Sequence, residues 1–319
     1  MSKVAVVTTG GTIASTRDAH GISRPAITGA DLIGDEQTDV ELRVVDVMSK
    51  DSSSMTFADM DRVRDAVADE LKDPGLDSVV VLHGTDTMEE TAFLLDLHHD
   101  DQRPVVFTGA QRTFDHPESD ARSNLAAAIS VGLDISSHGR GVLIAFGGSV
   151  HPAAGTRKAD TCSLDAFRSV HAGPVLLRTP EPLPWHPISD IRVDIIAVYP
   201  GADRVQIDAC VRAGAQGLVL DGLGSGNANP TIVEAVRDCV GARIPVAVTT
   251  RVPSGPISPV YGGGGGGHDL IAAGAVFSTD LRAAQARVLL AALLSDPDLV
   301  DLEKEFEQRA SLSPVRGSL

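Results

Sequence analysis

Two threonine hydroxyls are the strongest candidates for covalent chemistry in this sequence. Thr12 follows the apolar residues 4–7 and Thr85 follows the apolar residues 79–82, each after a turn that contains glycine. Neither stretch alternates apolar with polar residues, so both predict strands that are buried on two faces. Open α/β sheets bind ligands beyond the carboxyl ends of such strands. If the two strands are neighbours, both hydroxyls face one crevice.

A threonine hydroxyl is inert at its own pKa and needs a base or a proton path. Lys158 is one of five lysines and lies just past a predicted strand. A desolvated lysine beside Thr85 could take a proton, and Asp86 could orient that lysine or bind a cationic group of a substrate. A single threonine turn is more often a helix cap, but two such turns with an acidic residue favour catalysis.

Glycine-rich turns after a first strand also bind phosphates in nucleotide-binding folds. Gly10 and Gly11 fit neither the GxGxxG spacing nor the P-loop spacing, so a nucleotide-binding module is the weaker hypothesis. A thermal shift with NAD or ATP would revive it. The ten histidines show no metal-ligand spacing. His83, beside Thr85, is at least as well explained as a core histidine.

Helical and strand patterns alternate along the first half of the chain, which is typical of a doubly wound, mostly parallel α/β sheet. Thr56 with Asp59, and Thr87 with Glu90, have capping-box spacing and predict two helix starts. Strands are expected at residues 42–47, 78–82, 104–107 and 142–146, and helices at residues 57–72, from residue 87, and at 123–131.

Prolines at positions 180, 182, 184 and 187 favour an extended linker over regular structure. We therefore expect a larger N-terminal catalytic α/β domain at residues 1–179, a linker at 180–190, and a smaller C-terminal α/β domain at 191–319. Residues 15–31 predict a mobile active-site loop and the six glycines 262–267 a flexible one. In the second domain, strands are expected at 195–199, 217–220 and 245–249, helices at 230–239 and 281–294, and a frayed end.

Composition narrows the partners and the compartment. A formal net charge of −16 argues against nucleic acid or an anionic membrane as a partner. Three widely spaced cysteines fit a reducing compartment, and no apolar run approaches transmembrane length. The first predicted strand begins right after residue 3, which leaves no room for a signal peptide. We expect a cytoplasmic protein.

Residues 9–14 (TGGTIA) and 83–92 (HGTDTMEETA) resemble the two signatures of the bacterial-type L-asparaginase family. Together they are highly specific. The resemblance continues, in the family's order, over most of the chain. It includes Asp51-Ser52-Ser53, residues 108–110, Lys158, residues 224–227 and residues 251–255.

The resemblance implies two α/β domains and hydrolysis of the side-chain amide of L-asparagine to L-aspartate and ammonia, without a metal or organic cofactor. It implies that Thr12 is the nucleophile of an acyl-enzyme. Thr85, Lys158 and Asp86 resemble the family's second catalytic cluster, which activates a hydroxyl or water. Asp86 also corresponds to the carboxylate that pairs with the substrate's α-ammonium.

Further implied substrate contacts are Gly11, Ser52, Ser53, Gly84, Ala110 and Asn227. Ser52 and Ser53 correspond to the loop that holds the α-carboxylate and amine, and this loop looks like that of intracellular members. The family's sites lie at subunit interfaces. The resemblance therefore implies a homodimer, or two paired dimers, in which Asn227 enters the neighbour's site.

The sequence departs from the family in two places. The loop after Ser15 lacks the family's tyrosine, since the chain has only Tyr199 and Tyr261. The six glycines 262–267 replace a segment near which secreted members carry a glutamate. An amidohydrolase of the same fold that prefers glutamine or another amide is therefore the main alternative. A non-catalytic binder of an amino acid or nucleotide is a third.

Overall fold

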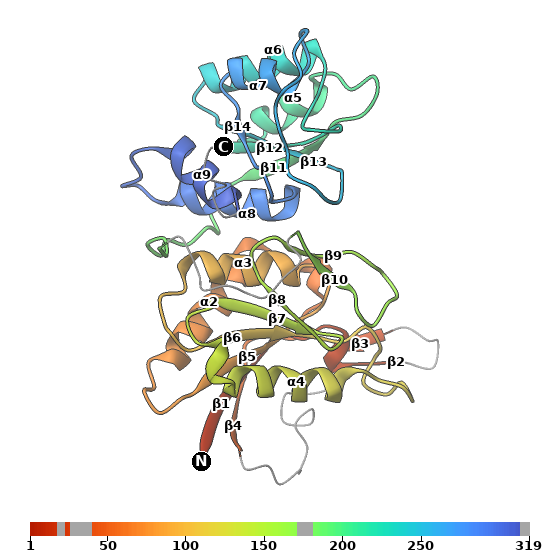
Figure 1. The fold of residues 1–319 in the computed structure, drawn as a ribbon, viewed down its shortest axis with the longest axis vertical. Helices are drawn as coiled ribbons and strands as arrows, with labels where there is room; N and C mark the ends of the chain where they lie inside the picture. Colours follow the sequence, from red (N-terminus) through yellow and green to blue (C-terminus); the bar gives the residue numbers. More distant parts are fainter. Residues whose placement is uncertain (18–22, 26–39, 171–180, 313–319) are drawn as a thin grey trace, which may run out of the picture. The chain divides into compact units, whose positions relative to one another are not determined.

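The computed structural model describes residues 1–17, 23–25, 40–170 and 181–312 (Figure 1). The chain divides into two compact units, Met1–Leu183 and Pro184–Leu319. The division falls inside the 180–190 segment expected as a linker, and the exact domain bounds stay a prediction. Most of the loop expected at residues 15–31 lies outside the described residues. Its described parts form a short antiparallel pair, β2 (Ser15–Arg17) with β3 (Ser23–Pro25).

The first unit contains a six-stranded sheet in the order β4-β1-β5-β6-β7-β8. All neighbours pair in parallel except β7 and β8. Strand β1 pairs directly with β5, so the condition for Thr12 and Thr85 to face one crevice is met. The strands are β1 (Ser2–Thr8), β4 (Val40–Asp46), β5 (Ser78–Leu82), β6 (Val105–Thr108), β7 (Val142–Phe146) and β8 (Ser149–Pro152).

Helices α2 (Phe57–Leu71) and α3 (Met88–His98) cover one face of this sheet, and α4 (Ala121–Leu133) covers the other (Figure 1). Alternate strand residues therefore enter two different cores. In β5, Val79 and Val81 pack with α2 and α3, whereas Val80 and Leu82 pack with α4. Both faces of the strand are buried, which explains why its sequence has no polar alternation.

The two predicted capping boxes have different outcomes. At α2 the box is confirmed, because Asp59 N donates to Thr56 Oγ1 (3.2 Å) and Thr56 N donates to Asp59 Oδ2 (2.9 Å). At α3 it is wrong, because Thr87 makes no side-chain cap. The Thr87 hydroxyl instead donates to the carbonyl oxygen of Ser52 (2.9 Å). A contact between distant segments has replaced the local one.

A small ribbon follows the sheet and carries Lys158. Strand β9 (Thr156–Lys158) pairs antiparallel with β10 (Phe167–Ser169). In the register, Lys158 lies opposite Phe167. Phe167 is fully buried and its ring packs on Phe146 of β7 at a centroid distance of 5.1 Å. This aromatic contact anchors the ribbon to the first core.

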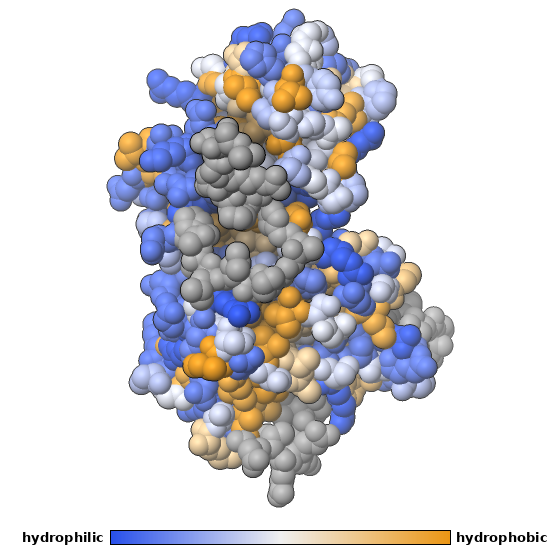
Figure 2. Space-filling model, in the orientation of Figure 1, coloured by the Kyte–Doolittle hydropathy of each residue, from blue (hydrophilic) through white to orange (hydrophobic). Residues whose placement is uncertain are grey.

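The second unit has a parallel sheet in the order β11-β12-β13-β14, and its own core. Hydrophilic residues cover much of the visible face of each unit (Figure 2). Within the described ranges, none of the helices has the length and apolar character needed to cross a membrane. The elements are β11 (Val193–Ala197), α5 (Val205–Arg212), β12 (Gly217–Gly222), α6 (Pro230–Gly241), β13 (Val246–Thr250), α7 (Gly267–Ala272), β14 (Val276–Phe277), α8 (Ala283–Ser295) and α9 (Leu302–Ala310).

Two expectations for this unit need correction. The glycine run is not simply a loop, because Gly267 begins α7 and the N–H groups of Gly264 and Gly266 donate to Asp269 Oδ2 at 2.8 and 2.9 Å. Residues expected to belong to the frayed end form α9, whose Phe306 is fully buried. The last residues, 313–319, lie outside the described residues. Helix α9 was not predicted because most of its residues are charged and its apolar stripe is narrow, whereas amphipathic helices are recognised by a wide apolar face.

Candidate active site

A small cavity of about 80 Å³ opens where the chain leaves β1, β4 and β5. Parallel strands bring their carboxyl ends to one edge of the sheet, so segments that are distant in sequence meet there. Both candidate threonines, Thr12 and Thr85, line this cavity. The lining residues are Gly11, Thr12, Asp51, Ser52, Ser53, Gly84, Thr85 and Asp86.

Glycine is required for the close approach of these turns. Gly11 has φ +83°, and a Cβ there would lie 2.4 Å from the Cα of Gly84. A Cβ on Gly84 would lie 2.5 Å from Ser52 Oγ. The turns after β1 and β5 are therefore packed backbone against backbone, and the Ser52 side chain of the turn after β4 packs against Gly84, an approach that only glycine permits. The cavity stays narrow enough for a small polar molecule.

Lys158 joins two of the cavity residues. Its Nζ lies 2.7 Å from Thr85 Oγ1 and 2.9 Å from Asp86 Oδ1. Thr85 is buried, and the Lys158 side chain is 19% exposed whereas that of Asp86 is 59% exposed. The Lys158 amino group thus connects a buried hydroxyl with a carboxylate that faces solvent. This arrangement can move a proton to or from the hydroxyl and can bind a cationic group of a ligand at the carboxylate.

The loop after β4 is tied to the loop after β5 by Ser52. Its hydroxyl accepts a hydrogen bond from Asp86 N (3.2 Å), and its carbonyl accepts the bond from Thr87. Ser52 is itself buried, whereas Ser53 is exposed. Thr12 begins the short helix η1 (Thr12–Ala14) and is half-buried, next to the fully buried Ile13. The core therefore fixes the turn that presents the Thr12 side chain to the cavity.

Two titratable groups lie just behind the cavity. Burial lowers the pKa of His83 to about 4, and its Nδ1 lies 2.7 Å from the carbonyl oxygen of Gly84. At neutral pH it is therefore a neutral core histidine, but only half of its ring is satisfied, because its buried Nε2 has no hydrogen-bond partner among the described residues. Glu89, in the first turn of α3, accepts a hydrogen bond from the backbone N of Lys158. Burial raises the pKa of Glu89 to about 7.

Glu89 is the site residue that sequence reasoning missed. It belongs to the quoted 83–92 segment, and its position in the first turn of a helix resembles that of any acidic residue that favours a helix start. The adjacent pair Glu89-Glu90 at the start of a mostly apolar helix was the available signal. Its contact with β9 depends on a strand 69 residues away, which no local pattern reveals.

Two predicted residues are not brought to this cavity within the described unit. Ala110 is 1% exposed and packs in the core cluster that contains Ile13 and Leu82. Asn227 belongs to the second unit, where its backbone pairs with Leu223 and its Oδ1 accepts a hydrogen bond from Gly267 N (3.1 Å). The side chain of Asn227 is therefore held by the glycine run.

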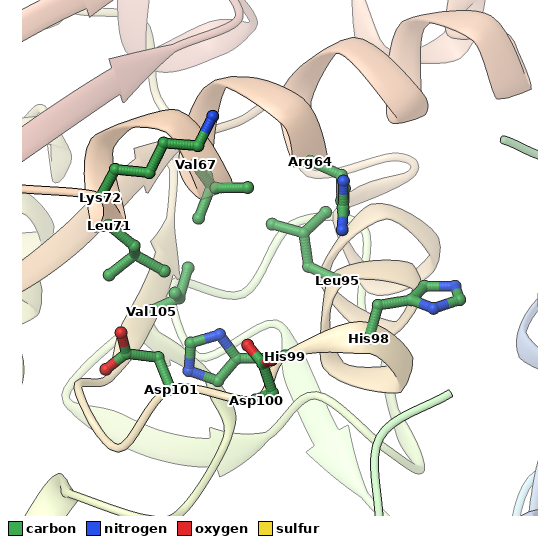
Figure 3. Close-up of a pocket in the computed structure, with 11 residues that line it drawn as sticks. Arg64, Val67, Leu71, Lys72, Leu95, His98, His99, Asp100, Asp101 and Val105 are labelled. Carbon is green, nitrogen blue, oxygen red and sulfur yellow. The ribbon is translucent and has the colours of Figure 1, made fainter. Parts of the chain in front are cut away.

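A larger cavity of about 200 Å³ lies at the other end of the first unit, between the C-terminal ends of α2 and α3 and the start of β6. Its apolar walls, which include Leu71, Leu95 and Val105, point toward one another (Figure 3). Its polar groups have structural roles, because Arg103 Nη2 lies 2.6 Å from Asp101 Oδ2 and His99 Nε2 lies 2.9 Å from the Arg103 carbonyl oxygen. Size alone does not identify the active site.

Comparison with known proteins covers both units. The family model described as "Asparaginase, N-terminal" matches residues 3–183, and that described as "Glutaminase/Asparaginase C-terminal domain" matches residues 192–304. The chain is 36% identical to a probable L-asparaginase of Deinococcus radiodurans, across 97% of this chain and 98% of that protein. It is 31% identical to an L-asparaginase of Bacillus licheniformis, across 92% and 95%.

Two further relatives extend the comparison. One subunit of a glutamyl-tRNA(Gln) amidotransferase from Methanosarcina mazei is 31% identical, across 98% of this chain and 77% of that protein. The crystal structure of a probable cytoplasmic L-asparaginase from Campylobacter jejuni superposes with a TM-score of 0.80 at 26% identity, across 97% and 100% of the two chains. With both family domains matched and relatives above 30% identity along nearly its whole length, the chain belongs to the asparaginase family of amide hydrolases.

Proposed function

We propose that this chain hydrolyses L-asparagine to L-aspartate and ammonia with Thr12 as nucleophile. The observation that carries the proposal is the Thr85–Lys158–Asp86 cluster, two members of which, Thr85 and Asp86, line the cavity that Thr12 also lines. A hydroxyl with a neighbouring proton acceptor, which is itself oriented by a third group, is the arrangement that activates a nucleophile. The names of the full-length relatives support asparagine as the substrate.

In the first half of the reaction, the Thr12 oxygen attacks the side-chain amide carbon. Its proton passes through the Thr85 and Lys158 groups and then to the amide nitrogen, so that the C–N bond breaks and ammonia leaves. Backbone N–H groups of the turns at Gly11 and Gly84 stabilise the oxyanion of the intermediate. The product of this half is an ester between Thr12 and the aspartyl group.

In the second half, water attacks the ester carbon and gives one proton back to the Thr12 oxygen as the C–O bond breaks. Asp86 binds the substrate's α-ammonium, since its carboxylate is the exposed member of the cluster. Ser52 and Ser53, on the cavity wall, hold the α-carboxylate and amine. These contacts fix the amide carbon near the nucleophile, which contributes more to rate than the intrinsic reactivity of a hydroxyl.

The test is ammonia release from L-asparagine by the wild type, by Thr12→Ala and by a matched control. Thr231→Ala is suitable as the control, because Thr231 is exposed on α6 in the second unit. We expect turnover to disappear in Thr12→Ala and to stay unchanged in Thr231→Ala. Retained turnover in Thr12→Ala would remove Thr12 from the mechanism.

A second candidate keeps the reaction and changes the amide. It is favoured by the relatives named as subunits of glutamyl-tRNA(Gln) amidotransferases and by the absence of a tyrosine between residues 15 and 31. Asparagine, glutamine and a peptide amide should be ranked by kcat/KM. A clear preference for asparagine rejects this candidate, and a preference for glutamine or the peptide amide replaces the first proposal.

We also propose a homo-oligomer in which Asn227 completes the site of a neighbouring chain. The Asn227 side chain is already oriented through Gly267 N, as a contact made in trans would need. Mixing inactive Thr12→Ala with inactive Asn227→Ala tests this, because a mixed dimer then contains one intact site. Activity should reappear on mixing. If mass spectrometry shows that mixed dimers have formed and they are inactive, the proposal is contradicted.

We place the protein in the cytoplasm, since Cys162, Cys210 and Cys239 are all free thiols and a structural neighbour is named as probably cytoplasmic. Disulfides are rare in reducing compartments. Cell fractionation followed by detection of the native protein checks this placement. Recovery in an extracytoplasmic fraction would contradict it.

A further inference from the structure

Lys158 is held at two points by one segment of the chain. Its Nζ contacts Thr85 and Asp86, which follow β5, and its backbone N donates to the carboxylate of Glu89, which begins α3. The two contacts involve different atoms of the same lysine. Together they set both the position of its backbone and the place where its side chain ends.

The geometry of the β9–β10 ribbon explains why Lys158 needs this acceptor. Ala159 N donates across the ribbon to the Ala166 carbonyl oxygen (2.8 Å). Because N–H groups alternate in direction along an antiparallel strand, the N–H of Lys158 points away from β10. A partly buried backbone N–H on that outer side requires a partner. The carboxylate of Glu89 takes the place that a third strand would occupy.

We propose that Glu89 is a positioning residue that holds β9 so that Nζ of Lys158 reaches Thr85 and Asp86. This inference rests on the proposed function, since it assigns a role within the same site. The contacts of Nζ are 2.7 and 2.9 Å long, so a shift of about 1 Å in the backbone of Lys158 would break them. A misplacement of that size can cost about 100-fold in rate.

The charge of Glu89 adds a pH-dependent component to this role. Burial raises the pKa of Glu89 to about 7, Glu90 on the same helix acts in the same direction, and Arg157 and Lys158 on β9 act against it. Ionised carboxylates accept stronger hydrogen bonds than neutral acids do. The hold on Lys158 therefore strengthens as Glu89 loses its proton, and we expect kcat to rise with pH through this range.

The decisive comparison uses Glu89→Ala, Glu89→Gln and the control Glu90→Gln, which changes the adjacent carboxyl group of the same helix. Glu89→Ala should lower kcat about 10–100-fold with little change in KM. Glu89→Gln keeps an oxygen that can accept the Lys158 N–H, so it should recover most of kcat but lose the rise of kcat near pH 7. Glu90→Gln should keep the wild-type kcat at high pH. Its rise of kcat should lie at lower pH than in the wild type, because the charge of Glu90 helps to raise the pKa of Glu89.

A second readout does not depend on turnover. Lys158 should react faster with an amine-directed reagent in Glu89→Ala than in the wild type, measured by peptide mass mapping. The four other lysines serve as internal standards. If Glu89→Ala does not fold, Glu89→Asp replaces it, because a carboxylate shortened by one methylene group should give an intermediate loss of kcat and faster labelling.

Several results would overturn the proposal: wild-type kcat in folded Glu89→Ala or Glu89→Asp, equal losses in the Glu89 and Glu90 variants, unchanged labelling of Lys158, or a wild-type pH profile in Glu89→Gln. Lys158→Met separates this failure from that of the proposed function. Inactive Lys158→Met with active Glu89→Ala refutes the positioning role alone. Active Lys158→Met refutes the proposed function itself.

Discussion

The two units build the same kind of strand end and use it differently. In the first unit, the turns after β1, β4 and β5 leave hydroxyl and carboxylate groups facing a cavity. In the second, the turns after β12 and β13 bind each other: Thr250 Oγ1 lies 2.5 Å from the Gly224 carbonyl oxygen and Ser225 Oγ lies 2.7 Å from that of Ser258. The edge of a parallel sheet thus collects polar groups in both units. Whether these groups can bind a ligand depends on whether they already have partners within the protein.

The largest expected difference between the units is catalytic. Lys158→Met should lower kcat about 10²–10⁴-fold, the range for loss of a general acid–base group. Thr250→Val, which removes a buried hydroxyl from the second unit, should leave kcat unchanged and lower the free energy of unfolding by about 1–3 kcal/mol. Ammonia release and urea unfolding measure the two effects. Comparable kcat losses in both variants would erase the contrast.

Glycine substitution sharpens the contrast at the level of packing. Gly11→Ala combines a φ of +83° with a Cβ placed 2.4 Å from Gly84 Cα, and should lower the free energy of unfolding by about 3 kcal/mol and abolish activity. Gly224→Ala in the second unit causes only backbone strain, because the atom nearest to a Cβ on Gly224 would be Asn227 Nδ2, at 3.7 Å. Gly224→Ala should lower the free energy of unfolding by about 1–2 kcal/mol. Equal melting temperatures of the two variants would contradict this explanation.

A partly buried carboxyl group in each unit gives a pH-dependent comparison. Burial raises the pKa of Glu89 from 4.5 to about 7, and it also raises that of Asp221 in β12. When folding raises the pKa of a carboxyl group, the folded state holds the proton more tightly than the unfolded state does. This contribution to the free energy of unfolding is complete below the unfolded-state pKa and is lost as pH rises through the folded-state pKa. For Glu89 that window runs from pH 4.5 to about 7.

Glu89→Gln should therefore gain stability relative to the wild type between pH 4.5 and pH 8, by on the order of 1–3 kcal/mol. Asp221→Asn should show a change of the same sign. Urea unfolding at the two pH values measures both differences. A Glu89→Gln variant whose stability follows the wild type at every pH would show that Glu89 does not titrate in this window.

The smallest effects concern the helix starts. Thr56→Ala at α2 and Asn229→Ala at α6 remove side chains that accept backbone hydrogen bonds. Each should lower the free energy of unfolding by about 1 kcal/mol and leave kcat unchanged. Thr87→Ala at α3 should instead raise KM, because its hydroxyl holds the loop of Ser52. Kinetics and thermal melting of the three variants distinguish these roles. An unchanged KM in Thr87→Ala would show that this tie is dispensable.

Prediction from the sequence worked where the signal was local. The buried strand at residues 78–82 and the capping box of Thr56 with Asp59 both depend on neighbours within a few positions, and both are present. It failed where a distant segment competed for a group. The hydroxyl of Thr87 bonds to Ser52, 35 positions away, and α9 depends on burial of Phe306 rather than on a wide apolar face.

By itself, the sequence predicted most of the longer strands and helices, the parallel α/β class and the candidate reactive groups, because periodicity and turn chemistry are properties of short segments. Only the tertiary structure decided that Lys158 meets Thr85 and Asp86 and that Glu89 holds its backbone. These contacts join residues about 70 positions apart. Their formation depends on which strands become neighbours, a choice made by the burial of whole faces.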